Sequence, residues 1–147
     1  MKVSYVDGEV VKESEFQLLL REHPRTLLYF YPKDNTPGCS LEARDFSQYL
    51  QRFYDQGIGV IGVSKDCPAC HKGFIAQQEL KIPLISDESG ILHQQFGVRA
   101  EKKNYGKTFM GTIRSSFLLD QQGNILRERR NVKAIGHVAR LLKELTA

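Results

Sequence analysis

The 147-residue sequence has few cysteines, no long apolar run and no block of like charge. Its three cysteines are an odd number, which argues against a structural disulfide framework and favours metal or redox chemistry at these thiols. No apolar run approaches the ~18 residues that a membrane span needs, and the first residues form no apolar signal segment. We therefore expect a cytoplasmic protein with no membrane partner.

The rest of the composition is that of an ordinary soluble protein. The net charge is +4 and the pI is about 9.0, but acidic and basic residues are interspersed along the chain. We interpret the basic excess as a solvated surface and expect no nucleic-acid partner. The length suffices for one hydrophobic core and no repeat or linker divides it, so residues 1–147 are expected to form a single domain.

Apolar runs and helical patterns alternate along the chain. A hairpin is expected at residues 3–11 around Asp7-Gly8, and residues 98–112 are expected to be a polar loop. The expected helices span residues 14–20, 37–55, 66–80, 88–96 and 134–145, and the expected strands span residues 26–31, 58–64, 83–87, 113–119 and 125–132. Asp66 is expected to cap its helix and Ile135 to be buried. This order predicts an α/β fold with a central mixed sheet and helices on both faces.

One stretch places a thiol where thiols react. The apolar run Leu27–Tyr31 predicts a buried strand, Pro32 stops it and shields its end, and Thr36-Pro37-Gly38-Cys39 opens a helix. A thiol with the ordinary pKa of ~8.5 is only ~3% thiolate at pH 7, and the thiolate is the nucleophile. The dipole of the helix lowers that pKa by about one unit.

The dipole alone is therefore insufficient, and a positive charge is expected beside Cys39. A charge-assisted hydrogen bond from an arginine, worth roughly 1.5–3 kcal/mol, lowers the pKa by one or two units more. Arg114, at the start of an expected strand, is the candidate donor. The Thr36 hydroxyl is expected to cap the helix, to accept from the Cys39 backbone N–H and to reach the sulfur.

These residues also carry a family resemblance. The stretch Phe30-Tyr-Pro-Lys-Asp-Asn-Thr-Pro-Gly-Cys39-Ser-Leu-Glu-Ala resembles the active-site loop of the peroxiredoxins, whose Pro-x-x-x-Thr-x-x-Cys pattern falls on Pro32, Thr36 and Cys39. The details are similar to the Q-type branch, also called bacterioferritin comigratory protein. Further similar segments follow in order: Gly62-Val-Ser-Lys-Asp66, His71-Lys-Gly-Phe74, Pro83–Asp87, Phe96-Gly-Val98, Tyr105-Gly-Lys107, Met110-Gly-Thr-Ile-Arg114 and Asn131-Val-Lys133.

The resemblance implies a thioredoxin-like fold and a thiol-dependent peroxidase. Cys39 is then expected to attack hydrogen peroxide or a small organic hydroperoxide and become a sulfenic acid. Thr36 and Arg114 are expected to hold the peroxide oxygens, with Pro32 completing the motif. The resemblance implies no metal or organic cofactor, thioredoxin or a similar thiol as reductant, and a monomer or weak dimer.

The chain departs from the Q-type branch in the cysteine expected to resolve the Cys39 sulfenic acid. Q-type members often carry a resolving cysteine five residues after the reactive one, where this chain has Arg44. Cys67-Pro-Ala-Cys70 lies instead at the start of the next long helix, so Cys67 and Cys70 are candidate resolving thiols. Our hypothesis is a relay that ends in a Cys67–Cys70 disulfide. A one-cysteine mechanism remains the alternative.

Other interpretations of the Cys67-Pro-Ala-Cys70 pair are open at this point. The main alternative is a thioredoxin-like disulfide oxidoreductase that uses Cys67 and Cys70. With His71 the motif also has the spacing of a haem attachment site, and the three residues include potential zinc ligands. His71 is otherwise expected to be a surface residue of its helix.

Overall fold

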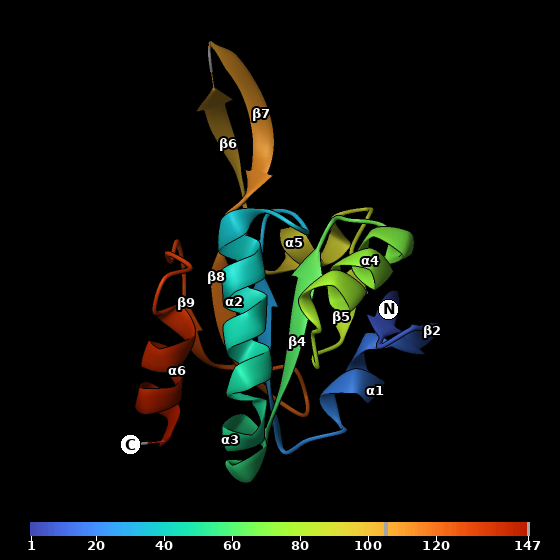
Figure 1. Cartoon of the computed structure of the whole chain (residues 1–147), viewed down its shortest axis with the longest axis vertical. Helices are drawn as coiled ribbons and strands as arrows, with labels where there is room; N and C mark the ends of the chain where they lie inside the picture. The colour runs from blue at the N-terminus through green and yellow to red at the C-terminus, as the bar shows by residue number, and fades with distance from the viewer. Residues whose placement is uncertain (105, 147) are drawn as a thin grey trace.

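A seven-stranded mixed sheet forms the centre of the computed structural model, which describes residues 1–104 and 106–146 (Figure 1). Its strands run in the order β2-β1-β5-β4-β3-β8-β9. They are β1 (Lys2–Asp7), β2 (Val10–Glu15), β3 (Arg25–Phe30), β4 (Ile58–Ser64), β5 (Leu84–Ser86), β8 (Ser115–Asp120) and β9 (Ile125–Arg129). β3, β4 and β5 are parallel, whereas β8 and β1 flank them antiparallel.

Helices cover both faces of this sheet, as expected. One face carries α2 (Pro37–Gln48), α3 (Leu50–Asp55), α4 (Pro68–Gln78) and α6 (His137–Thr146), and the other carries α1 (Phe16–Leu20) and α5 (Ile91–Gln95). Alternate residues of β3 point to the two cores, Leu27 and Tyr29 to the α2 side and Leu28 and Phe30 to the α1 side. Every residue of β4 is buried, which explains its continuous apolar sequence. None of the described helices is long and apolar enough to cross a membrane.

Several helix boundaries differ from expectation: α1 begins at Phe16 because residues 14–15 belong to β2, and α5 begins at Ile91 rather than at residue 88. The expected helix 37–55 divides at Tyr49, whose backbone (φ −96°, ψ 7°) is not helical. The last helix begins only at His137, because Gly136 has a left-handed φ of 73°, and Ile135 before it is 77% exposed rather than buried. The N-cap of α4 is Cys67 rather than Asp66.

Residues 98–112 are not a loop. They contain a two-stranded antiparallel hairpin, β6 (Arg99–Asn104) and β7 (Lys107–Thr112), which projects from the body at the end where α2 begins (Figure 1). Gly106, with a φ of 76°, lies in its turn. Glu101 and Met110 are exposed partners across the ribbon, so this pair does not show the alternation against a core by which a sequence reveals a strand. Tyr105 of the family-like segment lies outside the described residues.

Candidate active site

Cys39 lies in the first turn of α2, just beyond the end of β3, and its side chain is buried. The Arg114 Nη2 atom donates a hydrogen bond to its sulfur over 3.2 Å. Arg114 immediately precedes β8, and its backbone carbonyl accepts from the Val132 N–H over 3.0 Å. Gly38 leaves room for the guanidinium, because a Cβ there would be only 3.3 Å from Nη2. The expected pairing of the thiol with Arg114 is thus present.

Glu42 completes this cluster, a role that the sequence alone did not predict. Its Oε1 atom accepts from Arg114 Nη1 over 2.6 Å, and its side chain is almost fully buried. Burial raises the pKa of Glu42 to about 7, against the lowering effect of Arg114. Burial also lowers the pKa of Arg114, but Glu42 and Cys39 outweigh it and raise that pKa above its ordinary value. The sequence feature that points to Glu42 is its position three residues after Cys39, because residues i and i+3 lie on the same face of a helix.

Thr36 and Pro32 lie in the loop that leads into α2. Thr36 is the N-cap residue, but its hydroxyl donates to the Lys33 carbonyl over 2.9 Å and makes no capping bond. The expectation that it caps the helix and accepts from the Cys39 N–H is therefore wrong, because the hydroxyl is directed at the Lys33 carbonyl instead. Pro32 follows the buried Tyr31 and is exposed at the surface.

The chain resembles known proteins along most of its length. The model of the AhpC/TSA family matches residues 1–128. Peroxiredoxin Bcp of Bacillus subtilis is 41% identical over 138 residues, which cover 94% of this chain and 85% of that protein. Peroxiredoxin Bcp of Xanthomonas campestris pv. campestris is 41% identical over 133 residues, covering 89% and 83%. The solved structure of Xanthomonas campestris bacterioferritin comigratory protein, studied for alkyl peroxide reduction, superimposes with a TM-score of 0.88 at 35% identity, covering 99% of this chain and 90% of that one.

The chain belongs to the AhpC/TSA family, in its Q-type peroxiredoxin branch. The expected branch, the thioredoxin-like fold and the thiol-dependent peroxidase activity are thereby confirmed.

A buried polar network ties the active-site loop of this peroxiredoxin to α4. His71, expected at the surface, is fully buried, and its Nδ1 atom lies 2.7 Å from Asp34 Oδ2. Its Nε2 atom lies 3.0 Å from the Ile85 carbonyl, which can only accept, so Nε2 carries a proton. Tyr31 donates to Asp34 Oδ1 over 2.6 Å, and the Asp34 N–H donates to Asp66 Oδ2 over 2.9 Å. Asp66 therefore joins the loop to α4 instead of capping that helix.

The two remaining thiols are in contact at the start of α4. Cys67 Sγ and Cys70 Sγ are 2.8 Å apart, and Cys67 Sγ also accepts from the Cys70 N–H over 3.4 Å. These hydrogen bonds lower the pKa of Cys67, whereas the bond to Cys67 raises the pKa of Cys70. Cys70 is exposed and Cys67 partly so. His71 is held by Asp34 and Ile85, so it does not serve as a zinc ligand beside them, and no cluster of three metal-binding side chains occurs in the described part of the chain.

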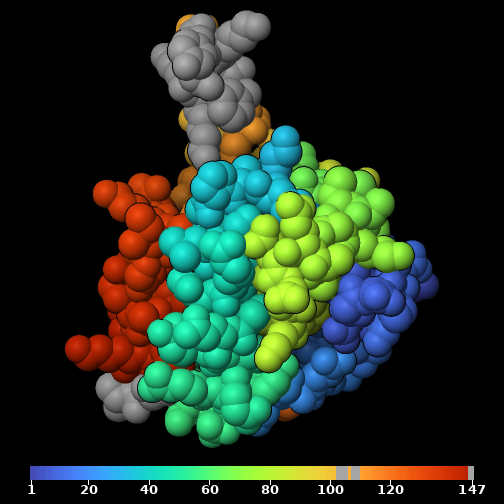
Figure 2. Space-filling view, in the orientation of Figure 1, coloured from blue at the N-terminus to red at the C-terminus, as the bar shows by residue number. Residues whose placement is uncertain are grey.

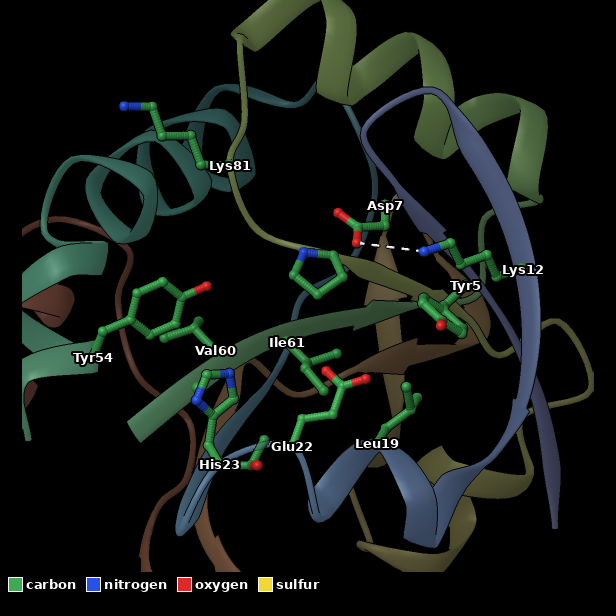
Figure 3. A pocket seen from close by; sticks show the side chains of 13 residues that line it. Tyr5, Asp7, Lys12, Leu19, Glu22, His23, Tyr54, Val60, Ile61 and Lys81 are labelled. Carbon is green, nitrogen blue, oxygen red and sulfur yellow. Dashed lines mark ion pairs between the residues drawn. The ribbon is translucent and has the colours of Figure 1, made fainter. Parts of the chain in front are cut away.

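A pocket of about 140 Å³ lies elsewhere, between β1, α1 and the inner strands (Figure 3). The rings of His23 and Tyr54 stack there at 5.1 Å, and Asp7 pairs with Lys12 over 4.0 Å. His23 fits because β4 has Gly59, where a Cβ would lie 2.3 Å from the ring. None of the residues that bind the Cys39 sulfur lines this pocket, so it is separate from the candidate active site.

Proposed function

We propose that Cys39 is the thiol that reduces the hydroperoxide in this peroxiredoxin. The observation that carries the proposal is the 3.2 Å hydrogen bond from Arg114 Nη2 to a buried sulfur at the start of α2. The positive charge and the helix N-terminus both favour the thiolate. The thiolate attacks the O–O bond, one oxygen is retained as Cys39 sulfenic acid, and the other leaves as an alcohol or water.

Arg114, Thr36 and Pro32 have separate parts in this proposal. Glu42 holds one arm of the guanidinium at 2.6 Å and leaves the other arm for the sulfur and the peroxide oxygen that approaches it. The Thr36 hydroxyl donates to Lys33, so its oxygen is still able to accept a hydrogen bond from the peroxide O–H. Pro32 ends β3 and begins the loop that carries Thr36.

The substrate class includes small organic hydroperoxides as well as hydrogen peroxide. This assignment is supported by the similar Xanthomonas campestris protein, whose structure concerns alkyl peroxide reduction. We propose that the chain acts as a single domain in the cytoplasm, as a monomer or weak dimer without a cofactor. Thioredoxin or a similar thiol is the proposed reductant, and Cys67 or Cys70 is the proposed resolving thiol.

Steady-state peroxide consumption with thioredoxin and thioredoxin reductase tests this proposal. Cys39→Ser is expected to abolish turnover, whereas Cys67→Ser is expected to retain part of it. Thr36→Val is expected to slow the reaction, and the matched control Thr36→Ser keeps the hydroxyl and most of the rate. Full turnover in Cys39→Ser would refute the proposal.

The second candidate function is a disulfide oxidoreductase centred on Cys67 and Cys70. The observation that favours it is the 2.8 Å contact between their sulfurs at a helix start. It predicts the reverse pattern, in which disulfide reduction survives Cys39→Ser and is lost in Cys67→Ser. An insulin reduction assay on the two variants separates the two functions.

A further inference from the structure

The reactive thiol and the paired thiols follow adjacent strands of the sheet. Cys39 comes after β3, and Cys67 comes after β4, which is its parallel neighbour. The carboxyl ends of adjacent parallel strands lie at the same edge of a sheet, and the Tyr31 N–H donates to the Val63 carbonyl at this edge over 3.1 Å. α2 and α4 also lie side by side on the surface (Figure 2), joined by the Arg44–Gln78 hydrogen bond of 2.9 Å.

The loop before Cys39 is anchored directly beside Cys67. The Asp34 N–H donates to the side chain of Asp66, which immediately precedes Cys67, and the Asp34 carboxylate is held by Tyr31 and His71. Cys39 is five residues beyond this anchor, so an unwound segment reaches at most ~17 Å from it. Neighbouring Cα atoms are ~3.8 Å apart, so Cys67 falls well inside that radius.

The start of α2 has to open before another thiol reaches Cys39. Cys39 is buried, so another thiol reaches its sulfur only after the first turn of α2 unwinds. Thr36 makes no side-chain capping bond, so opening of the helix start breaks no such bond. The first backbone bond of the helix, from the Ser40 N–H to the Thr36 carbonyl, is the one that opening breaks first.

We propose that Cys67 and Cys70 form a second redox centre, which takes the oxidising equivalent from Cys39 and presents it at the surface as a Cys67–Cys70 disulfide. This inference rests on the proposed function of Cys39. Cys67 attacks the sulfenic sulfur, which gives a Cys39–Cys67 disulfide and releases water. Cys70 then attacks Cys67 Sγ, which forms the Cys67–Cys70 disulfide and releases Cys39 as a thiolate to Arg114. An external dithiol reduces the exposed pair by two electrons.

The order of attack follows from exposure and hydrogen bonding. Cys67 is the less exposed thiol, and its sulfur accepts from the Cys70 N–H over 3.4 Å and lies 2.8 Å from Cys70 Sγ, contacts that suit a nucleophilic sulfur. Cys70 is the exposed thiol and already touches Cys67, so the exchange needs no further large movement. Cys39 is a good leaving group because Arg114 donates to its sulfur.

Peptide mapping after one equivalent of hydrogen peroxide tests the relay. Trypsin cuts after Lys65 and Lys72, so both thiols fall on one short peptide and their disulfide lowers its mass by two hydrogen atoms. We expect this species in the wild type, a trapped Cys39–Cys67 disulfide in Cys70→Ser, and sulfenic acid that reacts with dimedone in Cys67→Ser. Sulfenic acid in every protein with no Cys39-linked peptide in Cys70→Ser would overturn the relay and leave the peroxidase proposal standing.

A second measurement separates failure of the relay from failure of the peroxidase. In Cys39→Ser, titration with mixtures of reduced and oxidised dithiothreitol is expected to convert Cys67 and Cys70 together to one internal disulfide. If this disulfide does not form at any mixture, the second redox centre is wrong whatever Cys39 does. If it forms, but peroxide yields no sulfenic acid or disulfide in the wild type, the proposed function of Cys39 has failed instead.

Discussion

Replacing Arg114 with methionine removes two interactions that can be measured separately. The guanidinium donates to Cys39 Sγ and also balances the buried Glu42 carboxylate. The first loss affects the rate of reaction with peroxide, and the second affects the free energy of unfolding. The double variant Arg114→Met/Glu42→Gln lacks both the guanidinium and the buried carboxylate, so it isolates the effect on rate.

The stability effect has a sign and a slope that follow from the pKa of Glu42. This pKa is about 7 in the folded protein and 4.5 ordinarily, so the folded state loses stability as the pH rises from 4.5 to about 7 and then levels off. Without Arg114 the folded carboxyl stays protonated to higher pH. The loss in Arg114→Met is therefore expected to continue above pH 7 at about 1.4 kcal/mol per pH unit, toward the 3–5 kcal/mol cost of a broken buried pair.

The rate effect follows from the lost hydrogen bond to the sulfur. A charge-assisted bond of roughly 1.5–3 kcal/mol corresponds to about a 10- to 150-fold slower reaction. The chain has no tryptophan, so the rate is best followed as peroxide consumption in single turnover, with Glu42→Gln as the reference. Stability is measured by urea unfolding between pH 6 and 9. The reasoning is refuted if Arg114→Met/Glu42→Gln reacts as fast as Glu42→Gln, or if it keeps the slope above pH 7.

Further predictions concern groups outside the thiol chemistry. Burial, and to a lesser extent the charges of Arg140 and Arg114, lowers the pKa of His137 from 6.5 to about 4. The neutral imidazole therefore stabilises the folded state above pH 6.5, and this stabilisation is lost on acidification, by about 3 kcal/mol at pH 4. In urea unfolding against pH, His137→Gln should remove this loss, and an unchanged acid limb would contradict the assignment. Gly62→Ala in β4 would place a Cβ 2.7 Å from Leu84 and is expected to lower the free energy of unfolding by about 1–3 kcal/mol. Gly73→Ala in α4 places a Cβ with nothing within 4 Å and is expected to raise the free energy of unfolding by up to ~1 kcal/mol. Equal urea midpoints for the two glycine variants would show that the close contact is relieved at no cost.

The sequence predicted the sheet well because its strands have strong local signals. β4 is continuously apolar and buried on both faces, and the strand that precedes Cys39 ends at a proline. The β6–β7 hairpin was missed because its stretch was taken for a polar loop, and Glu101 and Met110, which pair across it, both face solvent. The register of that hairpin, in which Glu101 pairs with Met110, is a backbone pairing that a single sequence does not reveal.

In the candidate site, the sequence predicted what the chemistry demands and missed what depends on distant partners. Arg114 was expected because a helix dipole alone leaves a thiol largely protonated, and it does donate to Cys39. His71 was taken for a surface residue, because its partner Asp34 is 37 residues away in the chain. Glu42 shares a helix face with Cys39, but only the fold shows that Arg114 bridges them.

The N-terminal ends of α2 and α4 differ in a way that suits the proposed attack on peroxide at α2 and the proposed reduction by an external thiol at α4. At α2 the thiol is buried and bound by Arg114, and the helix start has no side-chain cap that opening would have to break. At α4 the capping atom is itself a sulfur, because Cys67 accepts from the Cys70 N–H, and the pair lies at the surface. In the proposed relay, a disulfide at α4 leaves α2 free to refold around Cys39. Reduction by an external thiol then needs no further opening of the proposed peroxide site.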